Sequence, residues 1–149
     1  DLGVLPEGDL LIHAGDLLQS GTLDELRRAA LWFKSQPHRV KIFVPGNHNR
    51  CFEQFPQQAR AMLEPDVITL CDTGVAVGGL NLWGSPWQPT LHDWAFMLPR
   101  GAPLRAKWDL IPDDTDILIT HGPAYGFGDR VDSTTRVGCR PGALVLTAI

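Results

Sequence analysis

Three short, mainly apolar runs constrain the fold more than any other feature of this sequence, because each ends in a polar side chain. The runs cover 10–14, 40–44 and 116–120. The first is followed by Asp16, the second by Asn47 and His48, and the third by His121. Open α/β sheets place their ligands at the carboxyl ends of buried strands. The pattern therefore predicts three strands that deliver an Asp, an Asn with a His, and a His to one site.

The first third of the chain has the pattern of a strand, a helix and a second strand. Thr22 is a candidate N-cap, and Glu25 three residues later completes a capping box. Apolar residues then recur at helical spacing, and Pro37 ends the helix. We expect the strands at 9–14 and 40–44 to pair in parallel through a right-handed crossover.

The remainder of the chain has a different character. It predicts a short helix at 55–63, a strand at 67–70, a hairpin over 74–83 that turns at Gly78-Gly79, a helix at 104–110 and a strand at 116–120. The hairpin indicates an antiparallel meander after the parallel first third. With 149 residues, the chain is predicted to form a single domain over 1–149.

Composition excludes several classes of protein. The chain is 44% hydrophobic and 20% charged, which is ordinary for a globular domain. Its net charge of -4 is spread along the sequence, so a nucleic-acid partner is not expected. The three cysteines, Cys51, Cys71 and Cys139, have no paired spacing, which favours a reducing, cytoplasmic location. No apolar segment has the length of a membrane span.

The two ends of the sequence suggest a piece of a longer protein. The chain begins at Asp1 rather than at a methionine, and it stops within the apolar stretch 144–149.

Each candidate ligand also has an ordinary structural explanation. Asp16 after glycine is typical of a turn or a helix cap, and Asn47 is typical of left-handed backbone. His48 and His121 could be satisfied by backbone groups. The four residues together are harder to explain in this way, because carboxylate, amide and imidazole groups form a ligand set suited to Mn, Fe or Zn.

The three remaining histidines are not candidate site residues. His13 lies within the first strand and is expected to be structural, whereas His38 and His92 are expected to be solvent or loop residues.

The ordered motifs resemble those of the calcineurin-like metallophosphoesterases. The central motifs of that family are matched by Gly15-Asp16, Gly46-Asn47-His48 and His121-Gly122. Longer sequence segments, at 11–16, 84–89, 98–101 and 119–123, resemble its metallophosphoesterase-domain-containing phosphodiesterase subgroup. The resemblance implies an α/β fold, a four-layer α/β/β/α sandwich that is incomplete at both ends of this chain.

The resemblance also implies a role for each residue. Asp16 would bridge two divalent metal ions (Mn, Fe, Zn or similar), and Asn47 and His121 would bind the second of them. His48 would lie beside the scissile phosphate and stabilise charge or protonate the leaving oxygen. These roles agree with the physics of two-metal phosphoester hydrolysis and of an imidazole that donates a proton near neutral pH.

The sequence departs from the family pattern in two motifs. It contains neither the opening Asp-x-His nor the closing Gly-His-x-His. As written, the first metal would keep Asp16 alone, and the second would keep Asp16, Asn47 and His121. Two interpretations therefore stand beside a phosphoester hydrolase: a catalytically impaired nucleotide-binding or scaffold relative, and a truncated fragment.

The substrate implied by the subgroup resemblance is a small phosphodiester such as a cyclic nucleotide. Trp87, with Trp94 and Phe96, could line a pocket that stacks a nucleobase. The alternative is that these aromatic residues cover an edge of the core. The sequence does not indicate the oligomeric state.

Overall fold

The structure is a computed structural model that describes residues 5–126 and 128–138. The expectations for Cys139 and for the apolar stretch 144–149 lie outside these residues. The elements, in chain order, are β1 (Leu10–His13), α1 (Leu23–Ser35), β2 (Val40–Phe43), α2 (Arg50–Gln54), α3 (Pro56–Leu63), β3 (Ile68–Thr69), β4 (Thr73–Val77), β5 (Leu80–Ser85), β6 (Gln88–Pro89), β7 (Met97–Leu98), α4 (Ala102–Trp108) and β8 (Ile117–Thr120).

The first sheet is parallel and has the order β1-β2-β3. Leu10 pairs with Val40 and His13 with Phe43, so the predicted strand–helix–strand unit is confirmed. The hydroxyl of Thr22 caps α1 by accepting from the Glu25 amide, and the Glu25 carboxylate accepts from the amides before the helix.

The second sheet has the order β4-β5-β8. The β4–β5 hairpin turns at Gly78 and Gly79, as predicted, and both have positive φ, 60° and 84°. Two successive residues with positive φ are the requirement of a tight hairpin turn, which glycine meets without steric cost. The last strand, β8, pairs in parallel with β5, and Leu82 lies opposite Ile117.

The two sheets pack face to face through a continuous apolar cluster. Ile42, Val44 and Leu70 come from the first sheet side, and Leu82 and Ile119 come from the second. The other face of the first sheet packs against α1, α2 and α3, where Leu26, Phe33, Phe43, Phe52 and Leu63 are buried.

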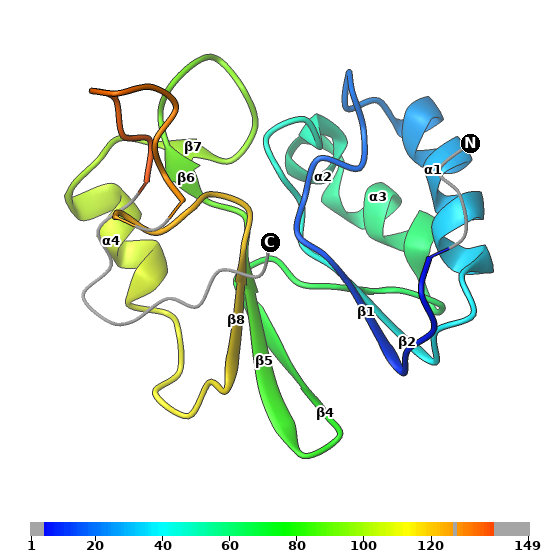
Figure 1. Ribbon diagram of the computed structural model, residues 1–149. Helices are drawn as coiled ribbons and strands as arrows, with labels where there is room; N and C mark the ends of the chain where they lie inside the picture. Colours follow the sequence, from blue (N-terminus) through cyan, green and yellow to red (C-terminus); the bar gives the residue numbers. More distant parts are fainter. Residues whose placement is uncertain (1–4, 127, 139–149) are drawn as a thin grey trace.

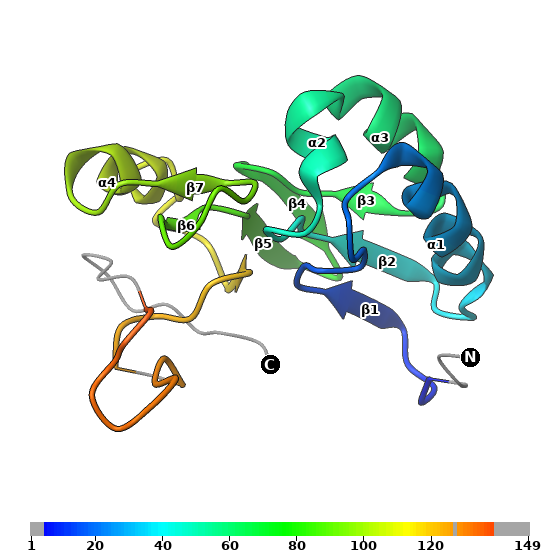
Figure 2. The same cartoon turned by 90° about the horizontal axis from the view of Figure 1, so that it is seen from above.

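The layers therefore follow the order helices, sheet, sheet, helix, and α4 lies beyond the second sheet (Figures 1 and 2). This is the α/β arrangement expected from the sequence. Two site-bearing strands, β1 and β8, lie at the ends of their sheet orders in the described part of the chain. Within residues 5–126 and 128–138, no helix has the length and apolar character that crossing a membrane requires.

Some local features differ from the expectations. The helix α2 was not predicted, because its five residues are too few to show a helical period. The strands β6 and β7 have two residues each and were also missed. His38 was expected to be a solvent or loop residue. It lies in the loop between α1 and β2, but it is only 5% exposed, and its Nε2 lies 3.0 Å from the Pro6 carbonyl oxygen. The solvent alternative fails because the segment before β1 covers the side chain.

Replacing Gly84 with Ala should destabilise the contact between the two sheets. A Cβ atom there would lie 2.4 Å from Leu70 Cβ and 2.7 Å from Val44 Cγ2, so the sheets would have to separate. Overpacking of this kind costs about 1–3 kcal/mol of unfolding free energy, measurable by urea denaturation.

Gly8→Ala is the matched control for Gly84→Ala. A Cβ atom at Gly8 would meet its nearest neighbour, in His38, at an ordinary 3.6 Å. This variant should keep or slightly raise stability, because alanine restricts the unfolded chain. Equal stability of the two variants would show that the sheets do not meet at Gly84.

Candidate metal site

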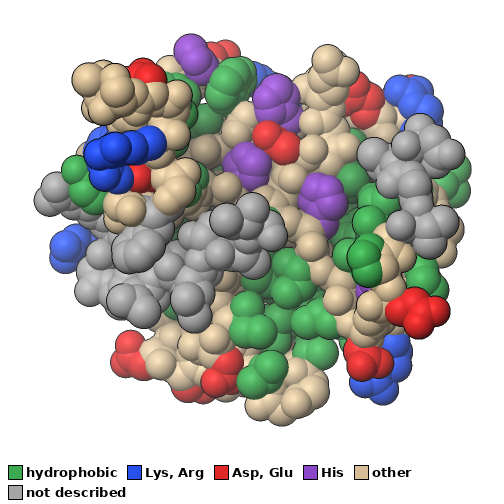
Figure 3. Space-filling model, viewed as in Figure 1, with side chains coloured by type: hydrophobic (Ala, Val, Ile, Leu, Met, Phe, Trp, Pro, Cys, Tyr) green, Lys and Arg blue, Asp and Glu red, His purple; other side chains and the backbone are tan. Residues whose placement is uncertain are grey.

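Asp16, Asn47 and His121 meet between the two sheets, although they come from three separate strand ends. His121 Nε2 lies 3.0 Å from Asn47 Oδ1 and 3.4 Å from Asp16 Oδ2. Histidine side chains surround an acidic side chain near the centre of the face shown in Figure 3. The side chain of Asp16 is 34% exposed and that of His121 16%, so the cluster is accessible from solvent.

The hydrogen-bonding roles in this cluster indicate a place for a cation. His121 Nδ1 lies 2.9 Å from the Ala14 carbonyl oxygen, which only accepts, so Nδ1 carries the proton. In the neutral ring, Nε2 is then an acceptor that faces two further acceptors, Asn47 Oδ1 and Asp16 Oδ2. Three acceptor atoms at one point require either an additional proton or a metal ion, and the donor set suits a divalent ion.

Among the described residues, no three His, Cys, Asp or Glu side chains form a group that could hold a metal. The present cluster contains two side chains of these types, and the amide oxygen of Asn47 is the third potential ligand atom. The residues therefore fit one metal ion with three protein ligands.

Two glycines allow the loops to approach one another. Gly15 has a φ of 106°, and a Cβ atom there would lie 2.3 Å from His121 Nδ1. A Cβ atom at Gly46 would lie 2.4 Å from Asp16 Oδ1. Asp16 itself has a φ of 58°, in the left-handed region that Asp tolerates better than most residues. The backbone is thus shaped to bring the three side chains together.

Asn49 connects two of these loops, and the sequence reasoning missed it. Its side chain is fully buried, and Oδ1 accepts from the Asp16 amide at 2.9 Å and the Gly46 amide at 2.7 Å. The sequence signal for Asn49 was its place two residues after Asn47, although that place alone does not predict a bridge between loops.

Gln88 is the second residue that the sequence reasoning missed. Its Nε2 donates to Asn47 Oδ1 at 2.8 Å and fixes the orientation of that amide. Gln88 lies in the motif at 84–89 that carried part of the family resemblance, and this was the available signal.

His48 lies beside the cluster but points in another direction. Its amide donates to Asp16 Oδ1 at 2.9 Å, and its Nδ1 lies 2.6 Å from the Gln19 carbonyl oxygen. The Gln19 contact places the proton of the neutral ring on Nδ1. Trp94 packs against the His48 ring with a centroid distance of 5.4 Å, and His92 lies 4.5 Å from Trp94.

Asp16 and His121 shift each other's pKa. Burial acts to raise the pKa of Asp16, but hydrogen bonds from His121 and the His48 amide outweigh it, and the pKa is lowered. Burial acts to lower the pKa of His121, but Asp16 and the Ala14 carbonyl outweigh it, and the pKa is raised. Both shifts favour the charged forms, a carboxylate beside an imidazolium, when no metal is bound.

His13 faces the helices rather than the cluster of ligand atoms. Its ring contacts Phe33 and Phe43 at centroid distances of 5.8 Å and 5.7 Å. Burial lowers the pKa of His13, which agrees with a neutral residue of the core.

Trp87 is partly buried and held by three neighbours. Its Nε1 donates to Asp72 Oδ2 at 2.6 Å, and its ring contacts Phe96 at a centroid distance of 5.5 Å. The Lys107 ammonium lies 4.3 Å from the ring centroid. Trp94, by contrast, is 39% exposed.

The fold is a layered α/β sandwich, and Asp, Asn and His side chains converge at its strand ends. Metallophosphoesterases share this combination of fold and site. Comparison with known proteins identifies the class directly. The sequence model of the calcineurin-like phosphoesterases matches residues 2–142. The chain belongs to the calcineurin-like phosphoesterase family, whose members are metal-dependent phosphoric ester hydrolases.

Curated relatives agree with this assignment. The chain is 41% identical to Metallophosphoesterase domain-containing protein 1 of Homo sapiens and of Mus musculus, over 91% of this chain and 48% of each relative. It is 38% identical to the Probable rhamnogalacturonate lyase C of Emericella nidulans, over 91% of this chain and 13% of that protein. The chain thus spans about half the length of the first two relatives.

Asn47→Ala should reduce metal binding by removing one of three ligand atoms. We expect Mn²⁺ affinity to fall by at least about tenfold, because even changes in residues that only support a metal ligand commonly cost 10–100-fold. Calorimetric titration measures the affinity directly. Asn81→Ala is the control, because Asn81 lies at the β4–β5 hairpin and bonds to Asp114 instead. Equal affinities for the two variants would contradict the ligand assignment.

Metal binding should strengthen as pH rises from about 6 to about 8, because metal and proton compete for His121 Nε2. The pKa of His121 is raised above 6.5, so this proton must leave before a metal binds; Asp16, with its lowered pKa, stays ionised throughout this range. Titrations in buffers of different ionisation enthalpy measure the released proton. A pH-independent affinity without proton release would exclude His121 as a ligand.

Proposed function

We propose that this chain carries the metal centre of a phosphodiesterase that hydrolyses a small phosphodiester of the cyclic-nucleotide type. The observation that carries the proposal is the convergence of Asp16 Oδ2 and Asn47 Oδ1 on His121 Nε2, at 3.4 Å and 3.0 Å. The preference for a diester is supported by the likeness to the phosphodiesterase subgroup in the motifs at 84–89 and 98–101.

The proposed cofactors of the intact family site are two divalent ions, Mn, Fe, Zn or similar. Asp16, Asn47 and His121 would hold one of them, and Asp16 would also face the second. Such ions supply Lewis-acid stabilisation of phosphate oxygens and a hydroxide nucleophile at neutral pH. Two neighbouring residues would hold these ligands in position. Gln88 donates a hydrogen bond to the Asn47 oxygen, and the Asn49 oxygen accepts one from the Asp16 amide.

His48 is proposed as the catalytic residue. Its Nδ1–H donates to the Gln19 carbonyl, which fixes the orientation of the ring, and Nε2 would then be the nitrogen that faces the substrate. When Nε2 is protonated, it can donate that proton to the leaving oxygen of the ester. The His48 amide also holds Asp16 Oδ1, so the position of the acid is tied to that of the metal ligand.

Substrate recognition is proposed to use aromatic surface near His48. Trp87 remains the candidate for stacking a nucleobase, and its contacts with Phe96 and Lys107 would fix the ring for that role. Trp94 supports the same proposal more directly, because it is 39% exposed and packs beside His48. Aromatic faces stack bases with little sequence preference.

The proposed partner is a small phosphoester rather than a nucleic acid, and the proposed location is the cytoplasm. The net charge of -4 supports the former. The free thiols of Cys51 and Cys71 support a reducing compartment. Burial raises the pKa of each thiol to about 11, which agrees with inert rather than reactive cysteines.

Hydrolysis of bis(p-nitrophenyl) phosphate by the 149-residue chain, with and without Mn²⁺, tests the proposal. We expect metal-dependent turnover that His48→Ala reduces by about 10²-fold or more, because general acid catalysis contributes about 10²–10⁴-fold. Elemental analysis should find the same bound metal in His48→Ala as in the unchanged chain.

Asn47→Ala is the companion variant, and it should lose bound metal and turnover together. If His48→Ala emptied the site, the division of roles between His48 and the ligands would be wrong. A folded chain that binds no metal and shows no turnover would favour the alternative, a nucleotide-binding or scaffold relative.

A further inference from the structure

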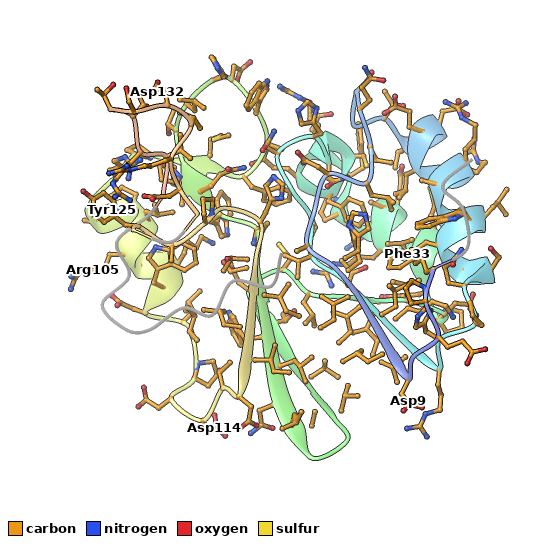
Figure 4. All side chains as sticks on the ribbon, viewed as in Figure 1. Asp9, Phe33, Arg105, Asp114, Tyr125 and Asp132 are labelled. Atoms are coloured by element: carbon orange, nitrogen blue, oxygen red, sulfur yellow. The ribbon has the colours of Figure 1, made fainter. Side chains whose placement is uncertain are left out.

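A second hollow lies on the α4 side of the molecule. It has a volume of about 500 Å³, and Leu104 of α4 forms part of its wall. Five larger side chains also line it, three arginines and two aromatic residues: Arg100, Arg105, Arg136, Trp108 and Tyr125. We refer to it as the arginine pocket. Arg105 and Tyr125 lie on the same side of the structure, far from Phe33 of α1 (Figure 4).

The arginine pocket carries positive charge that its surroundings do not fully neutralise. Within residues 5–126 and 128–138, no carboxylate lines it, although the whole chain has a net charge of -4. Arg136 pairs with the buried carboxylate of Asp129. Arg100 donates to the carbonyl oxygens of Val137 and Gly138, which orient its guanidinium but do not cancel its charge.

Arg105 differs from both of its neighbours. Its side chain is exposed, and within the part of the chain that the structure describes its guanidinium takes part in no recorded hydrogen bond or ion pair. A planar guanidinium that is exposed at the edge of a hollow is well suited to bind a phosphate in a bidentate manner, because its five N–H donors form a rigid fork.

Aromatic surface is the other component of the lining. The Arg136 guanidinium lies over the Tyr125 ring at 5.4 Å from its centroid, which holds that ring in place. Trp108 provides a second aromatic side chain from the end of α4. A site with aromatic faces beside arginines suits a ligand that has both an aromatic ring and an anionic group.

We propose that the arginine pocket binds a nucleoside monophosphate, with the phosphate at Arg100 and Arg105 and the base against Trp108 or Tyr125. The volume of about 500 Å³ lies within the range of about 300–1,000 Å³ typical of small-molecule sites. A purely apolar ligand would give the Arg105 guanidinium no acceptor, and inorganic phosphate would not use the aromatic faces. None of the candidate metal ligands lines this pocket, so binding there does not rest on the proposed phosphodiesterase activity.

Calorimetric titration of AMP into the full chain, with EDTA present to remove divalent metal, tests this inference. We expect AMP to bind, and adenosine and inorganic phosphate each to bind more weakly, because each lacks one half of the recognition. Arg105→Ala should weaken AMP binding by about tenfold, as expected for the loss of a charge-assisted hydrogen bond. Arg105→Lys keeps the charge but not the planar fork, so it should restore part of the loss.

Arg39→Ala is the matched control, since Arg39 is also an exposed arginine but lies just before β2 and does not line the arginine pocket. It should leave AMP affinity unchanged. A parallel titration with Mn²⁺ in place of EDTA completes the test. Three outcomes would overturn the inference: no AMP binding by the folded chain in either titration, binding with Mn²⁺ that is absent with EDTA, or equal loss in Arg39→Ala and Arg105→Ala. The second outcome would assign the nucleotide to the metal site, so failure of this inference is distinguishable from failure of the proposed function.

Discussion

The packing of the two sheets against each other is the contact on which the candidate site depends. It brings β8 beside the loop after β1, so that His121 Nδ1 reaches the Ala14 carbonyl across 107 positions of sequence. Gly84 permits the approach, because it faces Leu70 and Val44 where no side chain would fit. Without this contact, His121 would have no fixed position relative to Asp16 and Asn47.

The cluster at this contact is held by hydrogen bonds that point toward it from several directions. Asn49 ties the loop after β1 to the loop after β2, and Gln88 holds the Asn47 amide. Gln88 donates a hydrogen bond to the Asn47 oxygen, and the Ala14 carbonyl accepts one from His121 Nδ1. Lone pairs of Asp16, Asn47 and His121 then remain directed at one point. Either a proton on His121 or the proposed metal ion at that point would satisfy these acceptors, and a carboxylate, an amide and an imidazole together form a ligand set that suits a divalent ion.

The family assignment and the geometry support one another but answer different questions. Membership of the calcineurin-like phosphoesterases follows from a match across residues 2–142, whereas the function of this chain is a proposal. The arginine pocket adds a feature that the metal chemistry does not require. It concentrates positive charge around Arg100 and Arg105 in a chain with a net charge of -4, on the side of the molecule that carries α4.

The sequence determined the elements whose signals are local. Short apolar runs predicted β1, β2 and β8, Thr22 and Glu25 predicted the start of α1, and Gly78-Gly79 predicted the hairpin turn. It also selected Asp16, Asn47 and His121 as a set, because each follows an apolar run within a few residues and strand ends meet at a sheet edge. Helix α2 escaped prediction because five residues carry no period.

Tertiary structure alone decided the parts that depend on distant contacts. Only the folded chain shows that Asn49 bridges two loops, that Gln88 holds Asn47, and that His38 is buried. It also decided that arginines from 100, 105 and 136 share one hollow. The physical reason is that hydrogen bonds and burial depend on neighbours far apart in sequence, whereas strand, cap and turn propensities depend on residues a few positions away.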